Sequence, residues 1–466
     1  MARGKKVEQV LTLEEKLEQA LVPEDEQPYS IPENWCWCKI AFISNFERGI
    51  TFPASAKEHE ATKTNIPCLR TTNIQDELKI EDLLYIDKSY MKNNEEKYVR
   101  SDDIIMSSAN SKELVGKVSY VYGIPFPMTF GGFILIIRAK KINSRYLFYY
   151  LRLNFLCGKF MGESTQTTNI ANINTTKLKN LGLPLPPITE QQRIVDHIER
   201  LFSKLDEAKE KVQAVVDGFE LRKSAILHKA FTGELTNQWR QVHNIGLDSW
   251  EYVELGNICK VNPKKIDTTD LSDDLEVSFF PMSALSEIYG EITEPQTRQL
   301  KEVRTGYTNF SEGDVVFAKI TPCMENGKSA VIGKLVNDIG FGTTEFYVLR
   351  CGPKLYNFYL YHLLRDKHFR DEAKAVMTGA VGQQRVPKSF LEKYILHLPS
   401  VPEQKEIAQR LDETFAREIK ISGIAESVLT QIDYTKKSIL SRAFRGELGT
   451  NDPAEESAEE LLKTVL

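Results

Sequence analysis

The sequence predicts a mixed α/β (α+β) protein in which two globular domains are joined by two long helices that pair with each other. Three observations predict this architecture: an internal repeat, a heptad pattern in each copy of the repeat, and strand-like and helix-like segments outside it. Of the 466 residues, 41% are hydrophobic and 27% are charged. This composition is typical of a globular protein and excludes a mostly disordered or collagen-like chain.

The internal repeat has an offset of 213 residues. Residues 183–191 (LPLPPITEQ) return as 396–404 (LHLPSVPEQ), and residues 230–235 (AFTGEL) return as 443–448 (AFRGEL). Between 183 and 235 the two copies align without a gap, and 16 of 53 positions are identical, which indicates duplication rather than shared composition. Outside that block, residues 103–106 parallel 314–317 at an offset of 211.

The repeat sets the expected organisation of the chain. It comprises an N-terminal helical extension (1–27), a first domain (28–188), a central long helix (189–235), a second domain (236–400), a C-terminal long helix (401–448) and an acidic tail (449–466). The chain has no run of 18 apolar residues and no secretory signal, so we expect a cytoplasmic protein.

Each copy of the repeat predicts one long helix with an apolar heptad seam. Residues 190–230 would form a continuous helix about 60 Å long, and we expect the two helices to pair rather than to pack separately on their own domains. Thr189 and Gln192, like Ser400 and Glu403, have the spacing of a capping box, and a glycine near each helix end suits a C-cap. The first seam is Ile194, Ile198, Leu201, Leu205, Ala208, Val212, Val215 and Phe219; the second, weaker at Thr414 and Glu418, is Ile407, Leu411, Thr414, Glu418, Ile421, Ala425, Val428 and Ile432.

The two domains contain predicted strands and helices at matching places. Strands are expected at 103–107, 133–138, 315–319 and 346–350, and helices at 144–156 and 354–376. Gly131-Gly132 and Gly340-Phe341-Gly342 are interpreted as turns.

Motifs of catalysis are absent from the sequence. It has no Walker A phosphate loop, no nucleophile elbow and no N-P-P-[FY] motif of an adenine methyltransferase, and its seven cysteines and seven histidines include no C-x-x-C, H-x-x-x-H or H-E-x-x-H spacing. We therefore expect a binding protein with no catalytic residue, no metal site and no cofactor of its own.

Local charge allows a nucleic-acid partner although the formal net charge is −5. The two ends, 1–27 and 449–466, are acidic, and residues 28–182 carry a net charge of +5. Polar loop segments beside basic residues supply side chains that can bind phosphates or base edges, although such segments are often simple turns. The candidate DNA-binding residues are Arg70, Thr71, Asn73, Ser107, Ser108, Asn110, Lys112, Gln166, Thr167 and Asn169 in the first domain, and, at places interpreted as equivalent, Lys319, Thr321, Asn326, Lys328, Gln383, Gln384 and Arg385 in the second.

The chain resembles the specificity subunit of type I restriction–modification systems from about residue 28 to residue 448. The resemblance rests on the order domain, helix, domain, helix and on a series of short motifs. These are PENW at 32–35, LRxxNI at 69–74, MSS at 106–108, VGK at 115–117, LPxPPxxEQ at 183–191, and AFxGELT at 230–236 followed by Trp239-Arg240. The second copy departs from the pattern at 396–400 and lacks the Trp-Arg pair.

The resemblance implies two target recognition domains that each read one half of a split DNA site, held apart by an antiparallel coiled coil with pseudo-twofold symmetry. It implies double-stranded DNA and two modification subunits as partners, and restriction subunits in a complete assembly. S-adenosylmethionine for adenine-N6 methylation, and ATP with Mg²⁺, would be bound by those partners. Gln191 and Gln404 would serve partner binding as well as helix stability. The alternative is a coiled-coil adaptor with no role at DNA.

Overall fold

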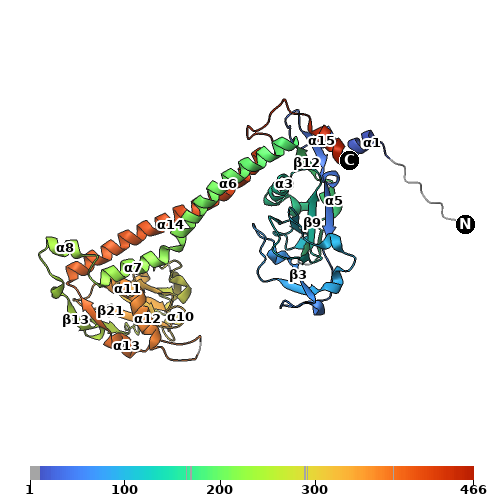
Figure 1. Ribbon diagram of the computed structural model, residues 1–466. Coiled ribbons are helices and arrows are strands. Elements are labelled where there is room, and N and C mark those ends of the chain that lie inside the picture. The colour runs from blue at the N-terminus through green and yellow to red at the C-terminus, as the bar shows by residue number, and fades with distance from the viewer. Residues whose placement is uncertain (1–10, 164, 168–169, 288–289, 291, 381) are drawn as a thin grey trace. The chain divides into compact units, whose positions relative to one another are not determined.

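The structure is a computed structural model that describes residues 11–163, 165–167, 170–287, 290, 292–380 and 382–466. The chain divides into two compact units, each of which is described by itself. Unit 1 comprises the chain up to Lys211 together with Val428–Leu466, and unit 2 comprises Val212–Ser427. The long helix α14 (Val401–Ala443) therefore supplies residues to both units (Figure 1).

Unit 1 is built on a four-stranded antiparallel sheet in the order β2-β9-β5-β7, with three smaller sheets in the orders β4-β3-β8, β10-β11-β6 and β1-β12. Its strands are β1 (Cys36–Lys39), β2 (Ser44–Arg48), β3 (Asn65–Leu69), β4 (Leu84–Asp87), β5 (Ile104–Ser107), β6 (Ala109–Asn110), β7 (Val118–Tyr120), β8 (Thr129–Phe130), β9 (Ile134–Ala139), β10 (Thr165–Thr167), β11 (Ile170–Asn172) and β12 (Gly182–Leu185). Its helices are α1 (Leu13–Ala20), α2 (Ile40–Ile43), α3 (Ser144–Leu156), α4 (Lys159–Glu163), α5 (Thr175–Lys179), α6 (Ile188–Asp217, up to Lys211) and α15 (Ala458–Val465).

Unit 2 repeats this plan with sheets in the orders β14-β21-β18-β19, β16-β15-β20-β17 and β13-β22. Its strands are β13 (Glu251–Glu254), β14 (Cys259–Val261), β15 (Glu276–Phe280), β16 (Gln296–Gln299), β17 (Thr308–Phe310), β18 (Val315–Ala318), β19 (Ser329–Val331), β20 (Gly340–Gly342), β21 (Phe346–Cys351) and β22 (Ile395–Leu398). Its helices are α7 (Phe219–Phe231), α8 (Asn237–Val242), α9 (Leu255–Ile258), α10 (Leu300–Val303), α11 (Asn357–Arg365), α12 (Lys367–Ala375), α13 (Lys388–Lys393) and most of α14.

The registers show that the two main sheets are copies. Ile104 pairs with Tyr120 between β5 and β7, and Val315 pairs with Val331 between β18 and β19, at the offset of 211 seen in the sequence. The four predicted strands and the helix at 144–156 are confirmed. The helix expected at 354–376 is instead two helices, because Asp366 adopts an extended conformation and caps the second with its side chain.

One predicted turn is wrong. Gly340–Gly342 is strand β20, which pairs in parallel with β15 and antiparallel with β17. A Cβ atom at Gly340 would lie 2.3 Å from the Phe310 ring. The glycine is therefore required by close packing inside the sheet rather than by chain reversal.

The long helices pair antiparallel in the described part of each unit. In unit 1, Lys209 of α6 bonds Asp433 of α14 at 2.9 Å, and Asp206 pairs with Lys436, so the partner numbers run in opposite directions. In unit 2, Arg222 of α7 bonds Glu418 of α14 at 2.8 Å. The predicted pairing is confirmed within both units.

The first predicted helix is not continuous. It consists of α6 and α7, which are separated at Gly218. Neither capping box forms. Thr189 lies inside α6 and donates its hydroxyl to Glu455 at 2.6 Å. Glu403 accepts from the side chains of Thr236 and Arg240, in the segment that follows α7. The predicted C-cap glycines, Gly233 and Gly446, have φ of 82° and 71°, as this role requires.

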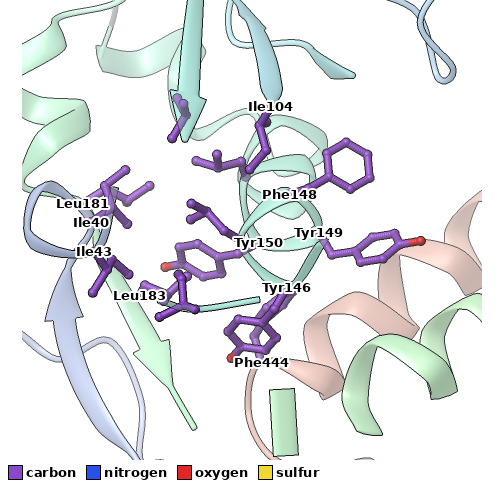
Figure 2. Close-up of a cluster of buried hydrophobic side chains, with 14 of the residues drawn as sticks. Ile40, Ile43, Ile104, Tyr146, Phe148, Tyr149, Tyr150, Leu181, Leu183 and Phe444 are labelled. Atoms are coloured by element: carbon purple, nitrogen blue, oxygen red, sulfur yellow. The ribbon is translucent and has the colours of Figure 1, made fainter. Parts of the chain in front are cut away.

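The end of α14 contributes to the core of unit 1. The ring of Phe444, one residue beyond the helix, lies 5.0 Å from the rings of both Tyr146 and Tyr150 (Figure 2). Phe231, its counterpart in the repeat, packs on Tyr359 in unit 2 at 5.4 Å. Each domain therefore buries the end of a helix that belongs to the repeat.

Both chain ends of unit 1 are folded where the structure describes them. The extension forms α1, and Leu17 and Leu21 pack against the core, while Val7 and Val10 lie outside the described residues. The acidic tail forms α15, whose Ala458 and Leu462 are fully buried. None of the described helices is long and apolar enough to cross a bilayer.

Candidate nucleic-acid interface

In both units the segment after one inner strand of the main sheet, β5 or β18, is hydrogen-bonded to the segment that follows the second domain helix, α4 or α12. In unit 1, β6 pairs with β11, and the N–H of Ile173 donates to the carbonyl of Ser108 at 2.9 Å. In unit 2, the N–H of Val386 donates to the carbonyl of Lys319 at 2.9 Å. The structure thus brings together two of the predicted polar loops in each domain.

A third segment completes this frame. The N–H of Ser108 donates to the carbonyl of Phe133 at 2.9 Å, and the N–H of Lys319 donates to the carbonyl of Glu345 at 3.0 Å. The backbone is therefore equivalent in the two units, while the side chains at equivalent positions differ. The differing pairs are Ser108 and Lys319, Asn110 and Thr321, Phe133 and Glu345, Ala171 and Gln384, and Asn172 and Arg385.

The unit 1 surface combines an exposed aromatic ring with threonine and basic side chains. Phe133 is 64% exposed and lines a cavity of about 340 Å³ with Lys57, Arg70, Thr71 and Thr72. Arg70 forms an ion pair of 2.9 Å with Asp82, whose side chain is 92% exposed. An ion pair with so exposed a carboxylate contributes little stability.

The unit 2 surface is organised by an arginine and a carboxylate. Arg385 binds Glu345 through two nitrogens, at 2.7 and 2.9 Å, and this guanidinium holds the pKa of Glu345 below its ordinary value. The backbone N–H of Gln384 donates to the Thr321 hydroxyl at 3.1 Å, and the Lys319 ammonium lies 5.2 Å from the ring centre of Tyr347. Gln383 is exposed beside them.

Three predicted residues of unit 1 are buried and have internal partners. The carbonyl oxygen of the Asn73 side chain accepts from the N–H of Arg70 at 2.8 Å and shapes the turn that presents Arg70 and Thr71. Ser107 accepts from the Asn110 amide at 3.1 Å, and Ser108 is 8% exposed. These residues position the surface rather than form its outer layer.

The remaining predicted residues of unit 1 lie at the edge of the same frame. Asn110 is half-buried in β6 and Lys112 is exposed just after it. Gln166 and Thr167 lie in β10, paired with Ala171 and Ile170 of β11. Asn169 lies outside the described residues.

Asn326 and Lys328 occupy a different part of unit 2. Asn326 lines a cleft with Glu287, Arg365 and Arg370. Lys328 donates to the carbonyl of Met282 at 3.3 Å. The register also corrects the equivalence expected for residues 70–73: β3 matches β15, so their counterpart is 281–284.

Gln191 and Gln404 are fully buried, which leaves no surface for a direct partner contact in this arrangement. Gln191 accepts from the N–H of Asn143 at 2.8 Å and donates to the carbonyl of Pro186 at 2.9 Å. Gln404 accepts from the N–H of Tyr356 at 2.7 Å and donates to the carbonyl of Pro399 at 2.8 Å. Each amide therefore fixes the start of a long helix to the start of a domain helix.

No sequence pattern points to Lys57, Phe133 or Glu345 as interface candidates. The apolar run that begins at Phe133 predicts a buried strand residue there, but Phe133 precedes β9 and is exposed. The turn-forming glycines just before it were the available signal. Nothing local distinguishes Lys57 or Glu345 from other charged surface residues.

Known proteins resemble the chain over most of its length. The profile of the type I restriction modification DNA specificity domain matches residues 32–216 and 248–428. The EcoEI specificity subunit of Escherichia coli is 34% identical over 260 residues, which are 47% of this chain and 43% of that one, so the chain spans under half of that relative. The StySPI specificity subunit of Salmonella potsdam is 23% identical over 426 residues, or 90% of each chain.

A solved structure agrees with this likeness. It comes from a study of complex assembly and conformational transition in a type I restriction–modification system, and it matches 90% of this chain and 100% of its own with a TM-score of 0.66 at 18% identity. That likeness supports the fold of two similar domains with long helices. Because two copies of the domain profile cover most of the sequence, the chain belongs to the type I restriction–modification DNA specificity domain family.

Proposed function

We propose that this chain is the DNA-recognition subunit of a type I restriction–modification complex, in which each unit reads one half of a bipartite DNA site. The observation that carries the proposal is the repeated interface frame with different side chains in its two copies. A shared backbone presents groups to DNA in the same way, while Phe133 in one unit and the pair of Glu345 and Arg385 in the other favour different bases.

The chemistry of the two surfaces fits recognition rather than reaction. An arginine binds guanine through two hydrogen bonds, an exposed phenylalanine suits a thymine methyl group or an unstacked base, and glutamine binds adenine. In unit 2 these groups are Arg385 and Gln383, and in unit 1 the aromatic group is Phe133. Two weak readers on one chain bind a composite site more tightly than either alone.

Partner subunits supply the chemistry in this proposal. Two modification subunits carry S-adenosylmethionine and methylate adenine N6 after the base leaves the helix, since a base in the duplex is not accessible to a methyltransferase. Restriction subunits that use ATP and Mg²⁺ join this core in a complete assembly. This chain directs both to the site.

The decisive experiment exchanges one reader and maps the modified adenines. The full chain is expressed with its methyltransferase partners, and residues 28–182 are replaced by the equivalent unit of the StySPI relative. We expect one half of the modified sequence to change and the other half to stay the same. A change in both halves, or modification with no defined sequence, would contradict the proposal, and the latter outcome would favour a scaffold without a role at DNA.

A further inference from the structure

Unit 2 contains a cavity of about 590 Å³ between α7, α11 and α14. Its described lining includes none of the interface residues named above. Aromatic rings, among them Phe280, Phe358 and Phe415, form much of its wall. The charged or polar side chains in its described lining are Lys223, Lys334, Tyr361, His362, Arg365 and Asp412. A cavity of this size, mostly apolar with a few polar groups, is typical of a small-molecule site.

His362 leaves one hydrogen-bonding atom without a partner at this cavity. Its ring is 2% exposed and its Nε2 lies 2.9 Å from the Asp412 carboxylate, while Nδ1 is buried with no partner in the described part of the chain. Burial lowers the pKa of His362 and so favours the neutral ring. In that ring Nε2 carries the proton and donates it in a hydrogen bond to the Asp412 carboxylate. Nδ1 is then an acceptor without a donor among the described residues, and a ligand N–H can supply one.

The same position in unit 1 is filled by the protein itself. Arg145 of α3 lies over the rings of Tyr120 and Tyr122, at 5.8 and 5.2 Å, and bonds Glu199 at 3.2 Å. At the equivalent positions of unit 2, Phe358 replaces Arg145, and a valine and a glycine replace the two tyrosines. The two tyrosine rings of unit 1 therefore have no aromatic counterpart at this cavity.

The charge balance changes in the same comparison. Lys436 of unit 1 forms an ion pair with Asp206, but the counterparts in unit 2 are Lys223 and Ile419. Among the described residues, the ion pair of Lys223 is with Glu220 at 3.7 Å, and that carboxylate side chain is 70% exposed. Burial and the nearby Arg365 lower the pKa of Lys223 to about 8. An anion beside Lys223 would replace the missing carboxylate.

We propose that this cavity binds a nucleoside phosphate, with the base against the aromatic wall, a base N–H donating to Nδ1 of His362, and the phosphate on Lys223. The planar base matches the aromatic wall, its N–H matches the acceptor Nδ1 of His362, and the phosphate matches the Lys223 ammonium. The nucleotide comes either from solution or from an unstacked residue of bound DNA, and only the second source rests on the proposed function.

The test for the free nucleotide is calorimetric titration of the full chain with adenosine 5′-monophosphate, adenosine and inorganic phosphate as probes. We expect the monophosphate to bind at least tenfold more tightly than either fragment. Lys223→Gln should weaken the monophosphate at least tenfold and leave adenosine unchanged. The control Lys388→Gln, on the exposed face of α13 outside the cavity, should change neither.

A second variant rebuilds the unit 1 arrangement inside unit 2. Gly333→Tyr with Phe358→Arg should fill the cavity and abolish binding of all three probes. If the urea midpoint of this variant differs from that of the wild type, its loss of binding is not used, and the titration of Lys223→Gln alone tests the proposal. Monophosphate binding that survives the filled variant with an unchanged midpoint, or that ignores Lys223→Gln, would overturn the proposal.

The DNA source is tested with the assembled chain and its methyltransferase partners on target duplexes carrying 2-aminopurine at single positions. A rise in 2-aminopurine fluorescence that Lys223→Gln and the filled variant reduce supports a DNA nucleotide in the cavity, even if the free monophosphate does not bind. If the free monophosphate does not bind and no 2-aminopurine position shows a rise in fluorescence, the proposal is wrong. Sequence-specific binding of the wild-type complex, measured by anisotropy in the same samples, reports separately on the proposed function.

Discussion

The indole N–H of Trp250 donates a hydrogen bond of 2.9 Å to the carboxylate of Glu403, which is fully buried at the start of α14. The same carboxylate accepts from Arg240 and Thr236, each at 2.7 Å, so it joins Trp250, just before β13, to the segment after α7. In unit 1 the counterpart, Glu190, accepts from Thr450 at 2.6 Å, beyond the end of α14. The start of each long helix is thus bound to the segment that follows its partner helix.

Removing the carboxylate of Glu403 should destabilise unit 2. Glu403→Ala leaves the guanidinium of Arg240, whose side chain is 6% exposed, buried without its anion. Breaking a buried ion pair from one side costs about 3–5 kcal/mol. We expect a lower urea midpoint for unfolding followed by circular dichroism. Glu413→Gln, in a more exposed pair with Arg417 on the same helix, should change it little; an equal shift in both variants would contradict this assignment.

Phe133→Ala should weaken binding to the first half-site. Loss of a stacked ring costs about 1–3 kcal/mol, or roughly 5- to 150-fold in affinity. Anisotropy with the methyltransferase partners present, on duplexes mutated in one half-site at a time, measures this. The control Tyr252→Ala removes a ring that is 77% exposed on β13. An equal loss in Phe133→Ala and Tyr252→Ala would remove Phe133 from the interface.

Arg385→Lys should impair the second half-site while the first is still read. Lysine cannot form the two parallel hydrogen bonds of a guanidinium, so about 1–3 kcal/mol of base discrimination is expected to disappear. The readout is a competition series of duplexes substituted at each position of the second half-site. Because Phe133→Ala acts on the other half, the two variants control each other. Unchanged base preference would leave Arg385 as a partner of Glu345 only.

The stability of unit 2 should decrease as pH falls below about 6.5. The pKa of His362 is lowered by burial, with Asp412 and Arg365 as the charged groups beside it. Below pH 6.5 the unfolded chain therefore binds a proton that the folded chain resists, and the free energy of unfolding falls by up to about 1.4 kcal/mol per pH unit. Melting temperatures from pH 7.5 to 5 check this. In His362→Gln the slope should be smaller; an identical slope would assign the effect to other groups.

Shortening both paired helices should change the spacing of the two half-sites. Deleting residues 213–216 together with 425–428, four residues from each long helical segment, removes about 6 Å of helix. This length corresponds to about two base-pair steps of roughly 3.4 Å. Mapping methylated adenines should show an altered spacer or no modification, whereas Gln213→Ala with Ser427→Ala should leave it unchanged. An unaltered spacer in the shortened chain would contradict a helical ruler.

The sequence predicted those elements whose signal is local or repeated. The duplication indicated two similar domains, the apolar runs located β5, β9, β18 and β21, and the heptads located the paired helices. Such patterns survive because each side chain in them faces the same environment along the element. The candidate loops were found for the same reason, since polar residues after buried strands mark an exposed edge.

The tertiary structure decided which of these polar groups remain at the surface. The polarity of Gln191 and Gln404 alone predicts exposed side chains. Both are buried instead, because they accept hydrogen bonds from the backbone N–H groups of Asn143 and Tyr356. Glu403 has the spacing of a capping residue, yet its carboxylate accepts hydrogen bonds from Trp250 and Arg240 instead. At the cavity beside His362, Val331 and Gly333 stand where unit 1 has two tyrosines. Sequence periodicity reports what one element needs, whereas hydrogen bonds and cavities depend on residues that only folding brings together.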